Sequence, residues 1–178
     1  EAFDAEGYFI TGDAMQMVDP VDANRGLMFD GRISENFKLM TGTWVRASQL
    51  RLDVLAALAP FAQDVVITGE DRSEVGAMIL PNRAAIAAQG WTLSEADGVI
   101  TCAPLQEELG RRLSALVAQS DQSTHVSCAL VLSEPASMAE GEATAKGNIN
   151  FPKFLRRRAD LVDQLYDPQT ASRITTAH

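Results

Sequence analysis

The chain has 178 residues, of which 46% are hydrophobic, enough for one well-buried core and for one domain with or without a fragment of another. Its net charge of -9 disfavours a nucleic-acid-binding protein, because affinity for a phosphate backbone depends largely on clustered Lys and Arg. No apolar run approaches the roughly 20 residues needed to span a bilayer, and the first residues show no signal peptide. We expect a soluble protein without nucleic-acid or membrane partners, taken from a longer chain.

The cysteines and histidines argue against a metal site. Cys102 and Cys128 fit neither a disulfide framework nor the spacing of metal ligands, and with only two histidines in the chain a histidine-based zinc or catalytic site is not expected. Cys128 alternates with Val126 and Leu130, which is typical of the buried face of a strand. We predict no metal ligands in this chain and a reducing, cytoplasmic location.

The N-terminal stretch predicts a β-hairpin. Residues 8–18 mix aromatic and β-branched side chains, the turn-rich residues 19–26 follow, and residues 27–29 are apolar again. Within it, Thr11-Gly12-Asp13 places a carboxylate beside a glycine, where the backbone can bend and a ligand can approach. A plain Asx turn explains the same three residues, and the tripeptide alone favours that simpler interpretation.

Residues 30–45 form a short, non-periodic segment that contains an arginine, a lysine and two glycines. We interpret this segment as a joint between the end of a larger domain, residues 1–30, and a compact module, residues 31–166. Residues 167–178 are expected to be a frayed tail. The domain organisation therefore predicts a pivot at the joint.

The module has the pattern of an α/β (α+β) fold with a central, mostly three-stranded sheet flanked by helices. Apolar runs of strand length alternate with segments of helical periodicity, whereas residues 89–101 have no clear assignment. The predicted elements are a helix capped by Ser48 and stopped by Pro60, paired strands at 63–68 and 75–80, a short helix at 84–88, a helix from Pro104, a strand at 126–132 and a last helix at 152–166.

Lysine is scarce, with Lys38, Lys146 and Lys153 as the only examples among 15 basic residues. Since arginine serves as the general surface cation here, each lysine is a candidate for a task that needs a compact charge on a flexible stem. An ordinary mobile surface lysine is the alternative for each. The single basic run, Arg156-Arg157-Arg158, is interpreted as the solvated face of a helix.

The order of these motifs resembles the carboxyl-terminal end of the acyl-adenylate-forming enzymes, which include acyl-CoA and aryl-CoA synthetases, luciferases and peptide-synthetase adenylation domains. The resemblance rests on residues 8–13, Gly31-Arg32, Phe37-Lys38, residues 42–45 and a late Lys-Gly loop. Within that superfamily, residues 31–45 and the late Lys-Gly-Asn-Ile-Asn look most like feruloyl-CoA synthetases. The resemblance implies a small mobile domain that rotates between two half-reactions.

The resemblance also implies roles for single residues. Asp13 would bind the ATP ribose hydroxyls, and Arg32 would contact the same ribose region. Ser34 stands where the family has its hinge residue, usually Asp or Lys, and Lys38 matches the lysine that follows the hinge. A further set, Gly42, Thr43 and Trp44, would form the loop beside the pantetheine tunnel.

The late loop departs from the family pattern, in which a lysine follows the glycine. Asn148 follows Gly147 here, and Lys146 precedes it. Because residues two apart in an extended segment point to the same side, a small register change brings Lys146 into the same role. We predict Lys146 as the adenylation lysine, with Lys153 as the alternative.

The function implied for the complete enzyme is an acid-thiol ligase that uses ATP, Mg2+ and CoA to activate an aromatic, feruloyl-type carboxylate. The phosphate-binding loop, the Mg2+-binding glutamate and the acyl pocket would belong to the enzyme's own large N-terminal domain, so this fragment alone is expected to be inactive. Two alternatives remain open, namely acyl transfer to a carrier protein and a non-catalytic α/β binding module. The oligomeric state and the identity of the acid are not predicted.

Overall fold

A four-stranded sheet forms the centre of the computed structural model, which describes residues 3–119 and 124–176. Its strand order is β10-β9-β6-β5; β6 and β9 are parallel, and the other two pairs are antiparallel. The strands are β5 (Ala62–Thr68), β6 (Val75–Pro81), β9 (Val126–Val131) and β10 (Ile174–Thr175). The three longer strands lie where the sequence predicted them, and the mixed α/β class is confirmed.

The fourth strand corrects the prediction of a frayed tail over residues 167–178. Ile174 pairs with Ala129 of β9, and Thr176 donates from its hydroxyl to the Val126 carbonyl at 3.0 Å. Ile174 is also 4% exposed and belongs to the core. The described part of this tail, through residue 176, is therefore held by β pairing and by burial.

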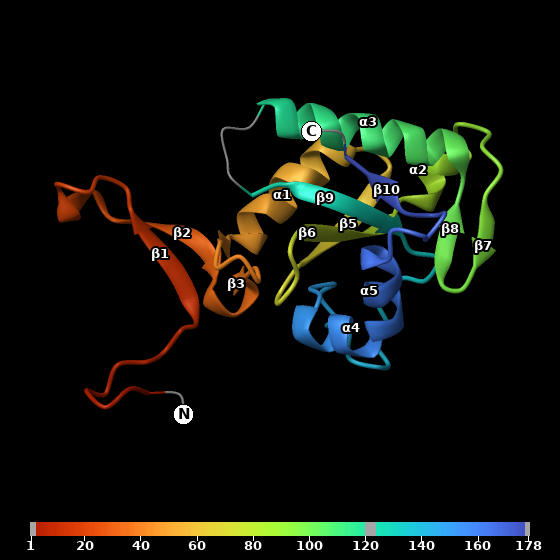
Figure 1. Ribbon diagram of the computed structural model, residues 1–178. Coiled ribbons are helices and arrows are strands. Elements are labelled where there is room, and N and C mark those ends of the chain that lie inside the picture. The colour runs from red at the N-terminus through yellow and green to blue at the C-terminus, as the bar shows by residue number, and fades with distance from the viewer. Residues whose placement is uncertain (1–2, 120–123, 177–178) are drawn as a thin grey trace.

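Helices cover both faces of the sheet, as Figure 1 shows. On one face lie α1 (Ala47–Leu58) and α3 (Ala103–Gln119), and on the other lie α4 (Phe151–Arg157) and α5 (Ala159–Tyr166). Alternate strand residues face the two layers, as β geometry requires. Val65, Ala77 and Ala129 face α1 and α3, while Val66, Met78 and Leu130 face α4 and α5.

A small hairpin occupies the segment that the sequence left unassigned. It consists of β7 (Ser94–Ala96) and β8 (Val99–Thr101), and it follows the short helix α2 (Arg83–Ala87). The Asn82 side chain accepts from the Ala85 N–H and so caps α2. Trp91 lies on the ring of Phe61, with 5.4 Å between ring centroids, and covers the core as expected.

Two helix predictions need correction. The expected cap Ser48 lies inside α1, whose N-cap position is Arg46 without a side-chain cap; the Ser48 hydroxyl donates instead to the Glu35 carboxylate. The single helix predicted at 152–166 is two helices, because Arg158 leaves the helical conformation with φ -107 and ψ 33. In both places a side chain forms a polar contact with a residue outside the helix, Ser48 with Glu35 and Arg158 with Glu142, in place of the local helical pattern.

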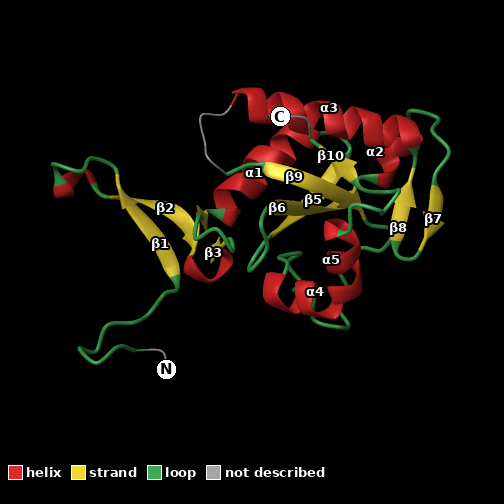
Figure 2. Ribbon diagram, in the orientation of Figure 1, coloured by secondary structure: helices red, strands yellow, loops and turns green. Residues whose placement is uncertain are grey.

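The N-terminal part forms the predicted hairpin, which projects away from the body (Figures 1 and 2). Its strands are β1 (Asp13–Met17) and β2 (Leu27–Arg32), with the 3-10 turn η1 (Ala23–Arg25) between them. The large hydrophobic side chains that are exposed among the described residues all lie in residues 3–44, except Leu52 and Met138. An isolated hairpin with so much apolar surface is not stable in water by itself.

The joint between hairpin and body is ordered into three short elements. They are the 3-10 turn η2 (Ile33–Glu35), β3 (Phe37–Lys38) and β4 (Trp44–Val45). The segment that the sequence showed as non-periodic is thus a turn followed by a small hairpin.

No helix of the described residues is long and apolar enough to cross a membrane.

Candidate functional site

Asp13 and Arg32, the two predicted nucleotide-binding residues, lie side by side at the end of the projecting hairpin that meets the body. They are register partners in β1 and β2, and Arg32 Nε lies 3.9 Å from Asp13 Oδ1. The Asp13 N–H donates to the Thr11 hydroxyl at 3.1 Å, and Gly12 has φ 72. The Thr-Gly-Asp turn therefore holds a partly exposed carboxylate beside a guanidinium.

Asp30 and Gly31, before the predicted pivot, and Glu35, after it, all contact the start of α1. Ser34 lies in the turn η2. Before it, Asp30 forms an ion pair with Arg46, and Gly31, with φ +90, approaches so closely that a Cβ there would lie 2.6 Å from the Ser48 Cβ. The orientation of the projecting hairpin is thus held by contacts that a rotation about residue 34 would have to break.

The predicted CoA-tunnel loop forms the tip of a hairpin over residues 37–45, which we name the joint hairpin. Lys38 and Trp44 are register partners across β3 and β4, and the Lys38 ammonium lies 4.9 Å from the centroid of the Trp44 ring. The Leu39 N–H donates to the Thr43 carbonyl at 2.9 Å, and Gly42 turns the chain with φ 85. The structure therefore brings Lys38 together with Gly42, Thr43 and Trp44.

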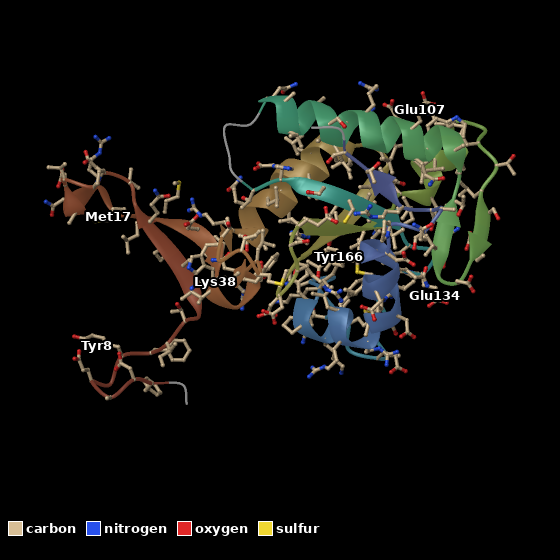
Figure 3. The ribbon with its side chains drawn as sticks, viewed as in Figure 1. Tyr8, Met17, Lys38, Glu107, Glu134 and Tyr166 are labelled. Carbon is tan, nitrogen blue, oxygen red and sulfur yellow. The ribbon has the colours of Figure 1, made fainter. Side chains whose placement is uncertain are left out.

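Apolar packing and backbone hydrogen bonds attach the joint hairpin to the body. A Cβ added to Gly69, in the β5–β6 turn, would lie 3.0 Å from the Phe37 ring and 3.1 Å from the Leu39 side chain. The Met40 N–H donates to the Arg72 carbonyl at 2.8 Å. Lys38 accordingly lies where the projecting hairpin meets the body, whereas Tyr8 and Met17 lie on the projecting part (Figure 3).

Lys146 lies at the tip of a second small hairpin, residues 143–149, which we name the Lys146 hairpin. Ala143 and Ile149 form an antiparallel bridge at its base. The Gly147 N–H donates to the Thr144 carbonyl at 2.9 Å, which makes Lys146 the third residue of a four-residue turn. Its side chain is exposed and forms no ion pair with any residue that the structure describes.

Lys153, the alternative adenylation lysine, has a different setting. It lies in the first turn of α4, and its ammonium is so close to the backbone that a Cβ at Gly141 would lie 2.6 Å from Nζ. Its long stem runs along the same glycine. Lys153 is thus folded against the loop before the Lys146 hairpin, whereas Lys146 is exposed on a turn.

The sequence missed a buried ion pair between Glu142 and Arg158, whose side chains are only 3% and 9% exposed. Burial by itself raises the pKa of Glu142, but hydrogen bonds from Arg158 and the Ser137 N–H outweigh it and hold the pKa below its ordinary value. The interpretation of residues 156–158 as a solvated face is therefore wrong for Arg158. The one signal in the sequence for this ion pair was Arg158 itself, a basic residue at a position where the helical period of Phe154 and Val162 predicts an apolar one.

The thiols and acidic residues offer no further site among the residues that the structure describes. Cys128 is buried in β9 as predicted, and burial raises the pKa of its thiol to about 11, so the thiol is neutral and a poor nucleophile at neutral pH. Within the described ranges, no group of three or more His, Cys, Asp or Glu residues could hold a metal ion. The candidate residues are thus three cations and one carboxylate, with Asp13, Arg32 and Lys38 on short strands and Lys146 on a turn.

A family model described as "AMP-binding enzyme C-terminal domain" matches residues 36–170, which is well over half of the chain. The chain belongs to this family. The match spans the two hairpins that carry Lys38 and Lys146.

Solved structures show the same fold. The A domain of a carboxylic acid reductase from Segniliparus rugosus, in complex with AMP and a carboxylic acid, superimposes with a TM-score of 0.68 and 24% identity, covering 93% of this chain and 24% of that chain. The corresponding A domain from Mycobacterium chelonae gives a TM-score of 0.68 and 20% identity, with the same coverage of both chains. At these identities the likeness shows the fold.

A curated relative supports the same family. The probable acyl-activating enzyme 16, chloroplastic, of Arabidopsis thaliana is 24% identical over 180 residues, covering 93% of this chain and 24% of that protein. The chain thus spans about a quarter of the length of its relatives.

Proposed function

We propose that this chain is the mobile carboxyl-terminal part of an ATP-dependent acid-CoA ligase that activates aromatic carboxylates of the feruloyl type. Residues 1–30 are assigned to the end of the large domain and residues 31–166 to the mobile domain. The observation that carries this proposal is the pair of exposed lysines, Lys38 and Lys146, on two separate hairpins of one family domain. The preference for feruloyl-type acids rests on the motifs of residues 31–45 and 146–150.

The partner that the projecting hairpin requires is the large domain of the same enzyme. Phe9, Met28 and Phe29 are 62%, 56% and 59% exposed, and burying such side chains contributes roughly 1.5 to 3 kcal/mol each. A large domain that covers this hairpin also places Asp13 and Arg32 at its edge. In that setting Asp13 accepts hydrogen bonds from the ATP ribose hydroxyls, and Arg32 contacts the same region.

The first half-reaction needs a cation at the nucleotide. The substrate carboxylate attacks the α-phosphorus of ATP, the bond to the pyrophosphate oxygen breaks, and acyl-AMP and pyrophosphate result. Two anions must approach each other while negative charge grows on the phosphoryl oxygens. The Lys146 ammonium offsets this charge, and one such group contributes on the order of a hundredfold in rate or more.

The second half-reaction needs a different surface. The CoA thiol loses its proton to solvent and attacks the acyl carbonyl, the bond between the acyl carbon and the AMP phosphate oxygen breaks, and a thioester and AMP form. Rotation of the mobile domain about Ser34 withdraws Lys146 and presents Lys38 with the loop of Gly42, Thr43 and Trp44 along the path of the pantetheine arm. In the first half-reaction, Mg2+ would accompany ATP and offset its phosphate charge, and a glutamate of the large domain would hold it.

The test separates the two half-reactions in the intact enzyme. Lys146→Ala is expected to slow acyl-AMP formation on the order of a hundredfold or more, measured as acid-dependent exchange of pyrophosphate into ATP, while thioester formation from supplied acyl-AMP is retained. Equal loss of both steps contradicts the assignment of Lys146. A matched variant, Lys153→Ala, is expected to retain both half-reactions.

Replacing CoA by a carrier protein in the second assay tests the alternative acceptor. Release of the acyl group to CoA supports the ligase, and release only to the carrier overturns it. A protein that binds ATP and acid but forms no acyl-AMP would instead be a binding module.

A further inference from the structure

The base of the Lys146 hairpin carries a buried ion pair that the proposed reaction does not use directly. Arg158 donates to both carboxylate oxygens of Glu142, with Nε 3.1 Å from Oε1 and Nη2 2.8 Å from Oε2. The Ser137 N–H donates to Oε2 at 2.8 Å. Because bidentate bonds between charged groups are strong and directional, Glu142 has a closely defined position.

The backbone of Glu142 joins the hairpin to α4. Its N–H donates to the Ser137 carbonyl, and its carbonyl accepts from the Asn150 N–H, both at 2.8 Å. Asn150 is in turn the N-cap of α4, since its side chain accepts from the Lys153 N–H at 3.2 Å. The hydrogen-bonded residues Glu142 and Asn150 thus flank the two arms of the Lys146 hairpin. A shift of Glu142 therefore moves the turn.

Arg158 is itself held from three directions. It donates to the carbonyls of Glu134 and Pro135 at 3.0 and 2.7 Å, and its guanidinium lies 4.4 Å from the centroid of the Phe154 ring. Phe154 is fully buried in the core layer under α4 and α5. The guanidinium thus links the rigid core to the base of the hairpin.

We propose that Glu142 and Arg158 are positioning residues that fix the direction in which the Lys146 turn presents its ammonium. This inference rests on the proposed function of Lys146, and neither side chain contacts substrate. If the ion pair between Glu142 and Arg158 is weakened, the turn at residues 144–147 can change its orientation while the sheet and helices stay folded. Misplacement of a charged group by about an ångström costs up to a hundredfold in rate.

The experiment measures both half-reactions in the intact enzyme with Glu142→Gln and Arg158→Lys. Both variants should lower the kcat of acyl-AMP formation about tenfold or more, leaving the KM for ATP and thioester formation from supplied acyl-AMP unchanged. Arg158→Lys keeps the charge but loses the bidentate geometry, so its effect should be the smaller. Equal losses in both half-reactions mean a merely structural role and overturn the proposal, as does no loss.

A matched control is Glu108→Gln, which removes a carboxylate that also binds two arginines, Arg111 and Arg112, on α3. Neither half-reaction should respond to it. Amide hydrogen exchange supplies a readout apart from activity. In Glu142→Gln, exchange at Thr144 and Gly147 should accelerate while Met40 in the joint hairpin stays protected, and unchanged exchange at Thr144 and Gly147 contradicts the proposal.

A double-mutant cycle separates this inference from the function of Lys146. If Glu142 acts through Lys146, then Glu142→Gln causes no further loss of adenylation in the Lys146→Ala enzyme, and independent, multiplicative losses overturn the proposal. If Lys146→Ala alone leaves adenylation intact, the proposed function of Lys146 fails. If Lys146→Ala slows adenylation and Glu142→Gln is harmless, only the positioning role fails.

Discussion

The joint hairpin and the Lys146 hairpin each carry an exposed lysine, Lys38 on a strand and Lys146 on a turn, but they are attached by different forces. Phe37 and Leu39 fix the joint hairpin by packing against Gly69, whereas the Lys146 hairpin depends on the buried pair of Glu142 and Arg158. Apolar packing does not depend on the charge of any side chain, whereas a buried ion pair needs both charges. The two hairpins thus have a similar shape, but different changes in sequence or pH should loosen them.

The largest expected effect comes from removing one charge of the buried pair. Arg158→Met leaves the Glu142 carboxylate buried without its main partner, which costs about 3 to 5 kcal/mol of unfolding free energy. Denaturant unfolding measures the loss. Arg25→Met is the control, since Arg25 is 63% exposed and lies 3.8 Å from Asp19, and it should cost at most about 1 kcal/mol. Equal costs would show that the buried pair supports the Lys146 hairpin no better than an exposed ion pair would.

Glycine substitutions give the next effect, because three glycines have a similar positive φ in different surroundings. Gly31, Gly42 and Gly147 have φ +90, +85 and +83, but a Cβ meets other atoms only at Gly31, where Ser48 lies at 2.6 Å. Alanine should cost about 1 to 2 kcal/mol at Gly42 and Gly147, and about 2 to 4 kcal/mol at Gly31, where overpacking adds to strain. A smaller cost at Gly31 than at Gly42, measured by thermal unfolding, would contradict close packing at the joint.

Acid should loosen the two hairpins differently. The pKa of Glu142 in the folded protein lies below its ordinary value of 4.5, so its contribution to stability is complete above that value and is lost as pH falls through the folded pKa. Amide chemical shifts of Thr144 and Asn150 should therefore change in this acid range before that of Met40. Simultaneous change at all three positions would show that both hairpins depend on the same titrating group.

The smallest effect is expected at the exposed pair of Lys38 and Trp44. Trp44→Leu removes a cation–π contact of 4.9 Å on a side chain that is 60% exposed, which contributes about 0.5 to 1 kcal/mol. Denaturant unfolding should show this modest loss. A cost as large as that of Arg158→Met would place the support of the joint hairpin in this pair instead of in Phe37 and Leu39.

The sequence was sufficient where the structure follows a local period. The strands at 63–68, 75–80 and 126–132 were visible because they are apolar runs buried on both faces, and Pro104 marked the start of α3. A two-residue strand such as β10 is too short to show a period. Its burial depends on a partner almost 50 residues earlier.

The candidate site was predictable only in part, for the same physical reason. Lysine scarcity and glycine turns pointed to Lys38 and Lys146, and the family motifs pointed to Asp13 and Arg32, which the structure brings together. Arg158 and Glu142 are 16 residues apart and meet through a loop without periodicity. Such pairs are fixed by tertiary contacts that a single sequence does not display.

We propose that Lys146 serves adenylation and Lys38 serves thioester formation. The most direct measurement is the rate of each half-reaction in the intact enzyme with Lys146→Ala and with Lys38→Ala, side by side. We predict a crossover, in which Lys146→Ala loses on the order of a hundredfold or more in acyl-AMP formation alone, and Lys38→Ala loses mainly thioester formation. Loss of the same half-reaction in both variants would contradict the division of labour between the two hairpins.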